Sequence, residues 1–134
     1  MDKKTCNHVG LFSIEPDILI DFYVEKLGFE RGESRSVPAS LMRPIFGLDV
    51  ECEMTKLHFG HVTVEVFAPG DVTLESRTDR TSGLNHWGLN VEDKAAYCRA
   101  AEARGAKIIR VPNRDRTIFF IEDPEGNRIE IFDK

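Results

Sequence analysis

The chain of 134 residues has room for one domain of ordinary size, and its 41% hydrophobic and 31% charged residues are typical of a globular protein. Eighteen basic residues against 23 acidic ones give a net charge of -5, which argues against a nucleic-acid-binding protein. No apolar run approaches the roughly 18 residues of a membrane span, and the first ten residues lack the apolar stretch of a signal peptide. Three cysteines without a CxxC motif suit a reducing compartment. We therefore expect a soluble cytoplasmic protein with no nucleic-acid or membrane partner.

In the first half of the chain, the sequence pattern predicts a strand, a helix and three further strands. Residues 8–15 are the first expected strand, and Pro16 suits the first turn of a helix. Apolar residues at helical spacing follow, and Gly28 fits the position just after the helix ends. The further strands are expected at residues 29–36, 50–58 and 61–67. Residues 36–49 are expected to form a loop.

The second half of the chain repeats this order of elements. A helix is expected to begin after Asp93, which can cap its first turn, and to end near Gly105. The sequence DPEGN at residues 123–127 predicts a tight turn before the last strand. The strands are expected at residues 86–91, 107–111, 117–122 and 128–132.

Short motifs recur between the halves at matching places. HVGL at residues 8–11 returns as HWGL at 86–89, and VEVF at 64–67 returns as IEIF at 129–132. This repeat predicts an α+β fold of two βαβββ modules, which form curved mixed sheets with helices on the outer face. We expect a single domain over residues 1–134, divided into module one at 6–68, a linker at 69–84 and module two at 85–134.

Strand parity places two imidazoles and two carboxylates on the sheet faces turned away from the helices, because side chains alternate between faces along a strand. The apolar neighbours of these residues point toward the helices instead. The four residues are His8, Glu65, His86 and Glu130. A polar strand face usually means contact with solvent. Their repetition in both halves favours a site for one divalent metal ion. Zn, Ni, Co, Mn and Fe all suit a ligand set of two imidazoles and two carboxylates.

These motifs resemble those of the vicinal oxygen chelate superfamily, which includes glyoxalases, methylmalonyl-CoA epimerases, extradiol dioxygenases, fosfomycin-resistance transferases and bleomycin-binding proteins. The resemblance lies in NHVGL, VTVEVF, LNHWGLNVED and EDPEGNRIEIFD and covers nearly the whole chain. It implies a metal held by His8, Glu65, His86 and Glu130, with a substrate that chelates it through two neighbouring oxygens. The superfamily hosts several chemistries, so the resemblance alone does not choose the reaction.

A glutamate at position 65 looks most like the glyoxalase and epimerase branch, which implies a metal-dependent lyase or isomerase. There the metal polarises a carbonyl, acidifies the adjacent C–H and stabilises the resulting enediolate or enolate. Glu65 and Glu130 are the implied catalytic residues that move the proton. Glutathione-dependent glyoxalases tend to carry an arginine where this chain has Phe12 and an asparagine where it has Pro69. A clamp for the glycyl carboxylate of glutathione therefore looks absent.

Two other functions stay open. An extradiol-type dioxygenase would use a facial triad of two histidines and Glu130, but Glu65 would crowd a position that must be open. A non-enzymatic cup that binds a drug or other small molecule need hold no metal. Cys6 and Cys98 are expected to be small buried residues rather than nucleophiles.

A homodimer with two equivalent cups is also expected, since open sheet edges invite pairing and symmetric dimers are common. The cup could form within one chain, or the first module of one chain could face the second module of its partner. The sequence leaves both arrangements open.

Overall fold

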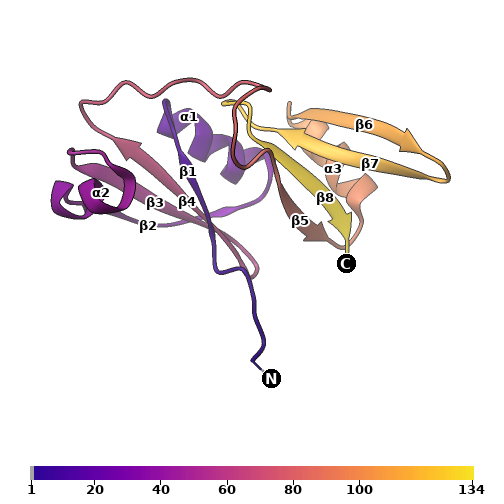
Figure 1. Ribbon diagram of the computed structural model, residues 1–134. Helices are drawn as coiled ribbons and strands as arrows, with labels where there is room; N and C mark the ends of the chain where they lie inside the picture. The colour runs from indigo at the N-terminus through magenta and orange to yellow at the C-terminus, as the bar shows by residue number, and fades with distance from the viewer. Residues whose placement is uncertain (1) are drawn as a thin grey trace.

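The computed structural model describes residues 2–134 and contains two modules of the same design (Figure 1). The first module comprises β1 (Val9–Phe12), α1 (Pro16–Asp21), the π-helical turn η1 (Phe22–Lys26), β2 (Glu30–Val37), α2 (Ala39–Phe46), β3 (Cys52–Phe59) and β4 (Val62–Pro69). The second comprises β5 (Trp87–Val91), α3 (Lys94–Ala103), β6 (Lys107–Asn113), β7 (Arg116–Glu122) and β8 (Arg128–Asp133).

Each module folds into a four-stranded mixed sheet, with strand order β1-β4-β3-β2 in the first and β5-β8-β7-β6 in the second. The first strand of each module pairs in parallel with the last strand, and the other pairings are antiparallel. A parallel pair requires a long crossover, and the helix with the intervening strands supplies it in each module. The predicted α+β fold of two βαβββ modules is confirmed.

The ends of the helices follow the local signals in the sequence. Pro16 occupies the first turn of α1, and the chain continues into η1 before Gly28 turns it with a φ of +83°. In α3 the Asp93 side chain accepts a hydrogen bond from the Ala96 backbone N–H at 2.9 Å. Gly105 follows that helix with a φ of +98°. A left-handed backbone costs a residue with a Cβ about 1–2 kcal/mol, which is why glycine suits both places.

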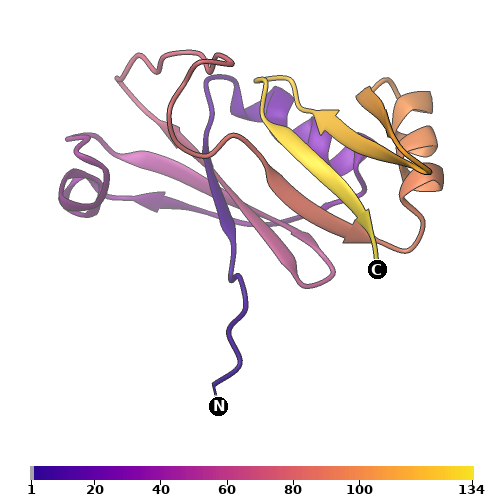
Figure 2. The ribbon, with the colours of Figure 1, turned by 45° about the vertical axis from the view of Figure 1, so that its right-hand side comes forward.

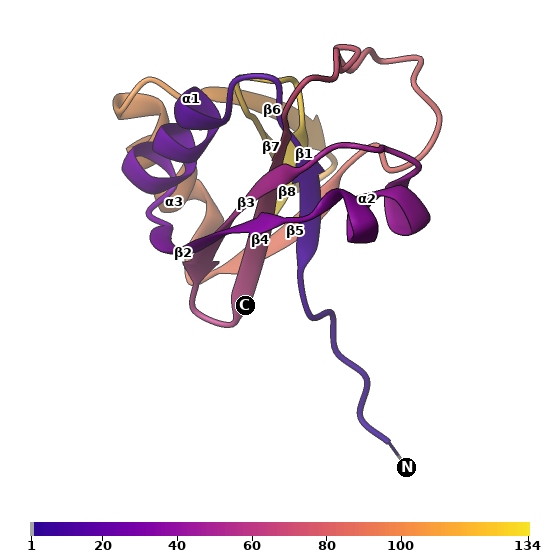
Figure 3. The same cartoon turned by 90° about the vertical axis from the view of Figure 1, so that its left-hand side faces the viewer.

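The expectation of a loop over residues 36–49 was wrong, because the middle of this segment forms the helix α2. Pro38 stands at its N-terminal cap and Pro44 lies inside it, so the sequence gives a weak helical signal. The helix still forms because the buried Met42 anchors it, and Gly47 ends it with a φ of +72°. Figure 3 shows α2 on the opposite side of the first sheet from α1.

One hydrophobic core joins the two modules. Residues 0–1% exposed come from both halves of the chain, among them Leu19, Val64, Leu89, Ile121 and Ile129. Helix α1 lies at the junction of the two sheets (Figures 1 and 2). The faces that carry the apolar strand residues therefore meet α1 and α3 inside the molecule, whereas α2 covers part of the opposite face of the first sheet.

The turn at residues 123–127 also fastens the second module to the first. The buried Tyr23 hydroxyl donates a 3.0 Å hydrogen bond to Asp123. The Glu125 carboxylate accepts a 2.7 Å bond from the Ile14 backbone N–H and a further bond from the Ser13 hydroxyl. Burial raises the pKa of Asp123, and hydrogen bonds from Asn127 and Tyr23 oppose that rise. These contacts fix how the two sheets sit relative to each other.

The segment from Gly70 to His86 forms no helix or strand and passes over one edge of the two modules (Figure 1). The residues before β1 extend away from the body of the molecule (Figure 2). None of the helices in residues 2–134 is long and apolar enough to cross a membrane.

Candidate metal centre

His8 and Glu65 form the first of two matching pairs. His8 directly precedes β1, and Glu65 lies in β4, where it is the register partner of Gly10. Residues two apart on a strand share a face, so His8 and Gly10 lie on the side to which Glu65 points. The His8 Nε2 and Glu65 Oε1 atoms are 3.2 Å apart, and 43% of the His8 side chain is exposed.

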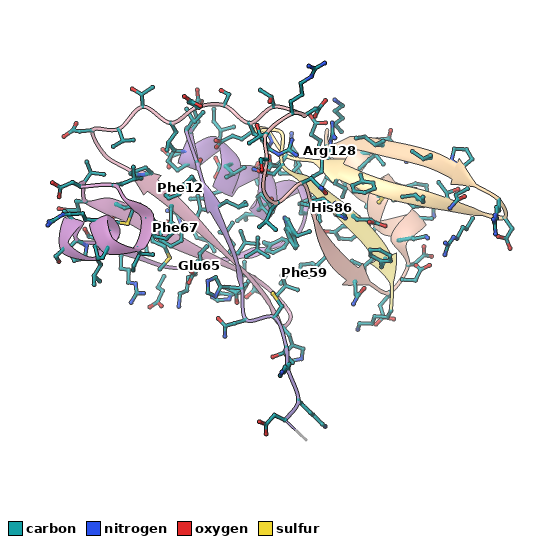
Figure 4. All side chains as sticks on the ribbon, viewed as in Figure 1. Phe12, Phe59, Glu65, Phe67, His86 and Arg128 are labelled. Atoms are coloured by element: carbon teal, nitrogen blue, oxygen red, sulfur yellow. The ribbon has the colours of Figure 1, made fainter. Side chains whose placement is uncertain are left out.

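His86 and Glu130 form the second pair with nearly the same geometry. His86 directly precedes β5, and Glu130 in β8 is the register partner of Gly88. The His86 Nε2 and Glu130 Oε1 atoms are 3.3 Å apart, and the His86 side chain is 41% exposed. Each predicted histidine thus lies next to its glutamate, as the alternation of side chains along the strands predicted. Figure 4 shows Glu65 on the first sheet and His86 on the second.

Each histidine is oriented by the asparagine that precedes it. The Asn7 side-chain oxygen lies 2.7 Å from His8 Nδ1, and the Asn85 oxygen makes the same contact with His86 Nδ1. An amide oxygen can only accept, so in these contacts Nδ1 is the donor. The other ring nitrogen, Nε2, then faces the carboxylate of the paired glutamate.

Sequence reasoning missed these two asparagines, although the repeat contains the signal that reveals them. The dipeptide Asn-His occurs at residues 7–8 and again at residues 85–86. Metal-binding histidines are typically held by a hydrogen bond from the second ring nitrogen, which sets both tautomer and ring orientation. An asparagine directly before the histidine in both halves is consistent with a role in orienting the imidazole ring.

The separation within each pair fits two ligands of one metal ion. With metal–ligand distances of about 2.1 Å, two ligands lie about 3.0 Å apart at a right angle and about 3.4 Å apart at a tetrahedral angle. The observed 3.2 and 3.3 Å fall between these values. Imidazole nitrogen and carboxylate oxygen are also a suitable donor set for a divalent transition metal.

The two pairs do not join into one site within a single chain. They lie on separate sheets, and no group of three or more histidine, cysteine, aspartate or glutamate side chains in residues 2–134 is placed to hold one ion. Each pair alone offers two ligands, whereas the usual protein site has three or four.

The other candidate side chains of the sequence lie elsewhere. Cys98 is buried, and burial raises its pKa to about 11, which suits an inert residue. The expectation that Cys6 is buried was wrong, because it precedes β1 and is exposed. His61 is exposed, and His58 contacts the Thr63 hydroxyl at 3.1 Å.

Two sheets of the same strand order, each carrying one His–Glu pair, define a fold built from a duplicated βαβββ module. The chain matches the family described as "Glyoxalase/Bleomycin resistance protein/Dioxygenase superfamily" over residues 5–131. It therefore belongs to this superfamily, as the resemblance of its motifs implied.

Two curated relatives are probable lactoylglutathione lyases. The chloroplastic protein of Arabidopsis thaliana is 28% identical over 99% of this chain and 37% of its own length. The protein of Synechocystis sp. is 35% identical over 40% of this chain and 44% of its own length. The matches thus span less than half of each relative.

Solved structures share the fold. A glyoxalase family protein from Enterococcus faecalis is 22% identical with a TM-score of 0.73, and covers 96% of both chains. The trypanothione-dependent glyoxalase I of Leishmania major is 19% identical with a TM-score of 0.72, over 98% of this chain and 87% of that one. TnmS3, an antibiotic-binding protein from Streptomyces sp. CB03234, is 16% identical with a TM-score of 0.67, over 99% and 98%.

Proposed function

We propose that this protein is a metal-dependent lyase or isomerase of the glyoxalase type, active as a homodimer with two shared metal centres. Each centre combines His8 and Glu65 of one chain with the second pair, residues 86 and 130, of its partner. The observation that carries the proposal is the duplicated pair, with its Nε2–Oε1 distances of 3.2 and 3.3 Å. Two such pairs together supply four ligands, whereas one pair alone supplies two.

The chemistry that fits these residues is proton transfer next to a carbonyl group. A divalent ion held by these residues would polarise the substrate carbonyl and make the neighbouring C–H more acidic. Glu65 and Glu130 are the carboxylates of the centre, and one of them would accept the proton and return it to the adjacent position. The side chains of Glu65 and Glu130 are 14% and 22% exposed, more sheltered than the histidines. Asn7 and Asn85 keep both imidazoles in the ligating tautomer.

Mixing two inactive variants tests the shared centre. His8→Ala and His86→Ala chains each lack one ligand in every centre, and we expect both to retain little metal. If centres are shared, a mixed dimer has one intact centre and one that lacks both histidines. Random exchange of subunits at equal concentrations makes half of all dimers mixed, so about a quarter of the centres should regain metal and activity.

The matched control is the same incubation of each variant with itself, which should restore nothing. If mixing also restores nothing, the centres do not combine the two chains as proposed. A monomer by light scattering would contradict the shared centre of a homodimer. Stoichiometric metal in a His8→Ala and His86→Ala double variant would contradict the metal assignment itself. Circular dichroism should show an unchanged fold, because both histidines lie off the helix-packed faces.

A second candidate function is metal-free binding of a small molecule. The apolar groove beside Glu65 favours it, and the likeness to an antibiotic-binding protein is consistent with it. The metal content of the purified protein separates the two functions, because a binding cup need hold none. Oxygen uptake with catechols would instead indicate an extradiol dioxygenase.

A further inference from the structure

An apolar groove of about 340 Å³ runs from the His8–Glu65 pair to helix α2. This volume lies at the small end of the range for small-molecule sites, about 300–1,000 Å³. Its apolar wall is formed by side chains of β1, β3, β4 and α2. They include Phe12, Leu41, Ile45, Phe46, Met54 and Phe67. The groove therefore continues directly from the proposed metal ligands.

Three phenylalanine rings from three different elements form the end of this groove. Phe46 of α2 packs edge-on against Phe12 at 5.2 Å and against Phe67 at 5.5 Å between ring centroids. Phe12 and Phe67 are 6.1 Å apart in the same kind of arrangement. Figure 4 shows Phe12 and Phe67 beside each other next to α2. Edge-to-face clusters of this kind offer ring faces and edges on which another flat apolar group can pack.

Helix α2 presents more apolar surface than its own folding requires. Met42 anchors the helix and is fully buried, whereas Leu41 and Ile45 are 50% and 62% exposed and line the groove. The second module has no such helix, since β6 and β7 are joined by a turn. Grouped exposed apolar residues on a soluble protein usually mark a binding surface.

Few charged side chains of this chain line the groove. Besides the His8–Glu65 pair, Arg35 is the single charged residue among the side chains that line it, and Arg35 is exposed. Phe12 is 41% exposed and forms part of the groove wall. A peptide carboxylate placed there would lose water and meet an aromatic ring, which is unfavourable.

Resting on the proposed function, the geometry points to a substrate with an uncharged aromatic or branched apolar group beside its two chelating oxygens. That group occupies the groove, and α2 is the wall that selects it. The substrate is then a small 2-oxo compound rather than a peptide–thiol adduct. Phe46 and Ile45 determine this specificity without taking part in the proton transfer.

Two hydroxamic acids test this inference, because both chelate a metal through two neighbouring oxygens and differ only in their substituent. Benzohydroxamate carries a phenyl group and acetohydroxamate a methyl group. With zinc-loaded protein, isothermal titration calorimetry should show benzohydroxamate binding at least about tenfold more tightly, since the phenyl ring buries more apolar surface. Phe46→Ala and Ile45→Ala should each reduce this ratio severalfold.

Ile18→Ala is the matched control, because Ile18 is also a half-exposed helical isoleucine, at 54%, but does not line the groove. It should leave the ratio unchanged. Equal affinity for the two compounds in the wild-type protein would overturn the inference and leave the metal centre standing. The inference is also overturned if Phe46→Ala separates the dimer without changing the ratio, because the apolar wall would then be a subunit contact.

If neither compound binds the zinc-loaded protein, the centre has no open position for a chelating substrate, the proposed function fails, and the groove is tested alone. Saturation-transfer NMR on chelator-treated protein should then still show contact between the protein and the phenyl protons of benzohydroxamate. That signal should weaken in Phe46→Ala and persist in Ile18→Ala. Its absence from the wild-type protein would overturn the groove assignment as well.

Discussion

Removal of the Tyr23 hydroxyl would test how much the hydrogen bond between Tyr23 and Asp123, which connects the two modules, contributes to stability. Tyr23 is fully buried, and its hydroxyl donates to Asp123 at 3.0 Å across 100 positions of sequence. Tyr23→Phe keeps the ring and its edge-on packing against Phe22 and Phe29, at 5.8 and 5.4 Å between centroids. The change therefore removes one hydrogen bond while leaving the packing of the core intact.

The expected loss of stability is about 1.5 kcal/mol. A hydrogen bond to a charged group contributes about 1.5–3 kcal/mol, and the lower end applies because Asp123 keeps the bonds from Asn127 and from the Glu125 backbone N–H. For a chain of this length, about 1.5 kcal/mol corresponds to a decrease in Tm of about 5 °C. Urea unfolding followed by circular dichroism measures the free energy directly.

The loss should also depend on pH. The folded-state pKa of Asp123 is raised, chiefly by burial, above an unfolded value of about 3.9. The contribution of this group to stability is therefore fully present below about pH 3.9 and is lost as the pH rises through the folded-state pKa. The Tyr23 hydroxyl favours the charged form of Asp123, so Tyr23→Phe should cost more at pH 7 than at pH 4.

Tyr97→Phe is the matched control for this experiment. The Tyr97 hydroxyl also bonds across the two modules, but its acceptor is the uncharged carbonyl of Leu27. Its removal should cost about 1 kcal/mol, equally at both pH values. The reasoning is refuted if Tyr23→Phe costs less than about 0.5 kcal/mol, or if its cost is the same at pH 4 and pH 7.

Three further predictions concern the candidate site and the thiols. Asn7→Ala should weaken zinc binding by about tenfold or more, measured by competition with a chromogenic chelator, and unchanged affinity would show that Asn7 does not orient a ligand. Glu65→Gln keeps the shape of the side chain but removes the base, so steady-state turnover of a 2-oxo substrate should decrease by about 10² or more; full activity would exclude Glu65 as the base. At pH 8, a chromogenic disulfide should label the exposed Cys6 quickly, whereas the buried Cys52 and Cys98, with their raised pKa values, should react only after unfolding. Two fast thiols in the native protein would contradict this.

The repeated elements could be predicted from sequence because they depend on interactions between residues close together in the chain. Alternating apolar and polar residues set which face of β4 and β8 meets the helices, and this places Glu65 and Glu130 on the open faces. Glycines at the ends of the helices and the Asp93 cap act through the backbone next to them, so their effect needs no distant partner. The fold and the approach of each histidine to its glutamate followed from these signals and from the repeat.

Other features depend on residues far apart in the chain, and only the tertiary structure decided them. Helix α2 has one proline at its N-terminal cap and a second inside it, so it is a weak helix by itself, and burial of Met42 stabilises it. The sequence of residues 123–127 predicts only a turn. In the structure, Asp123 and Glu125 also accept hydrogen bonds from residues of the first module. Which apolar faces pack together depends on all the elements at once. For that reason the sequence determined the two His–Glu pairs, one in each module, whereas the tertiary structure decided how the two sheets sit relative to each other.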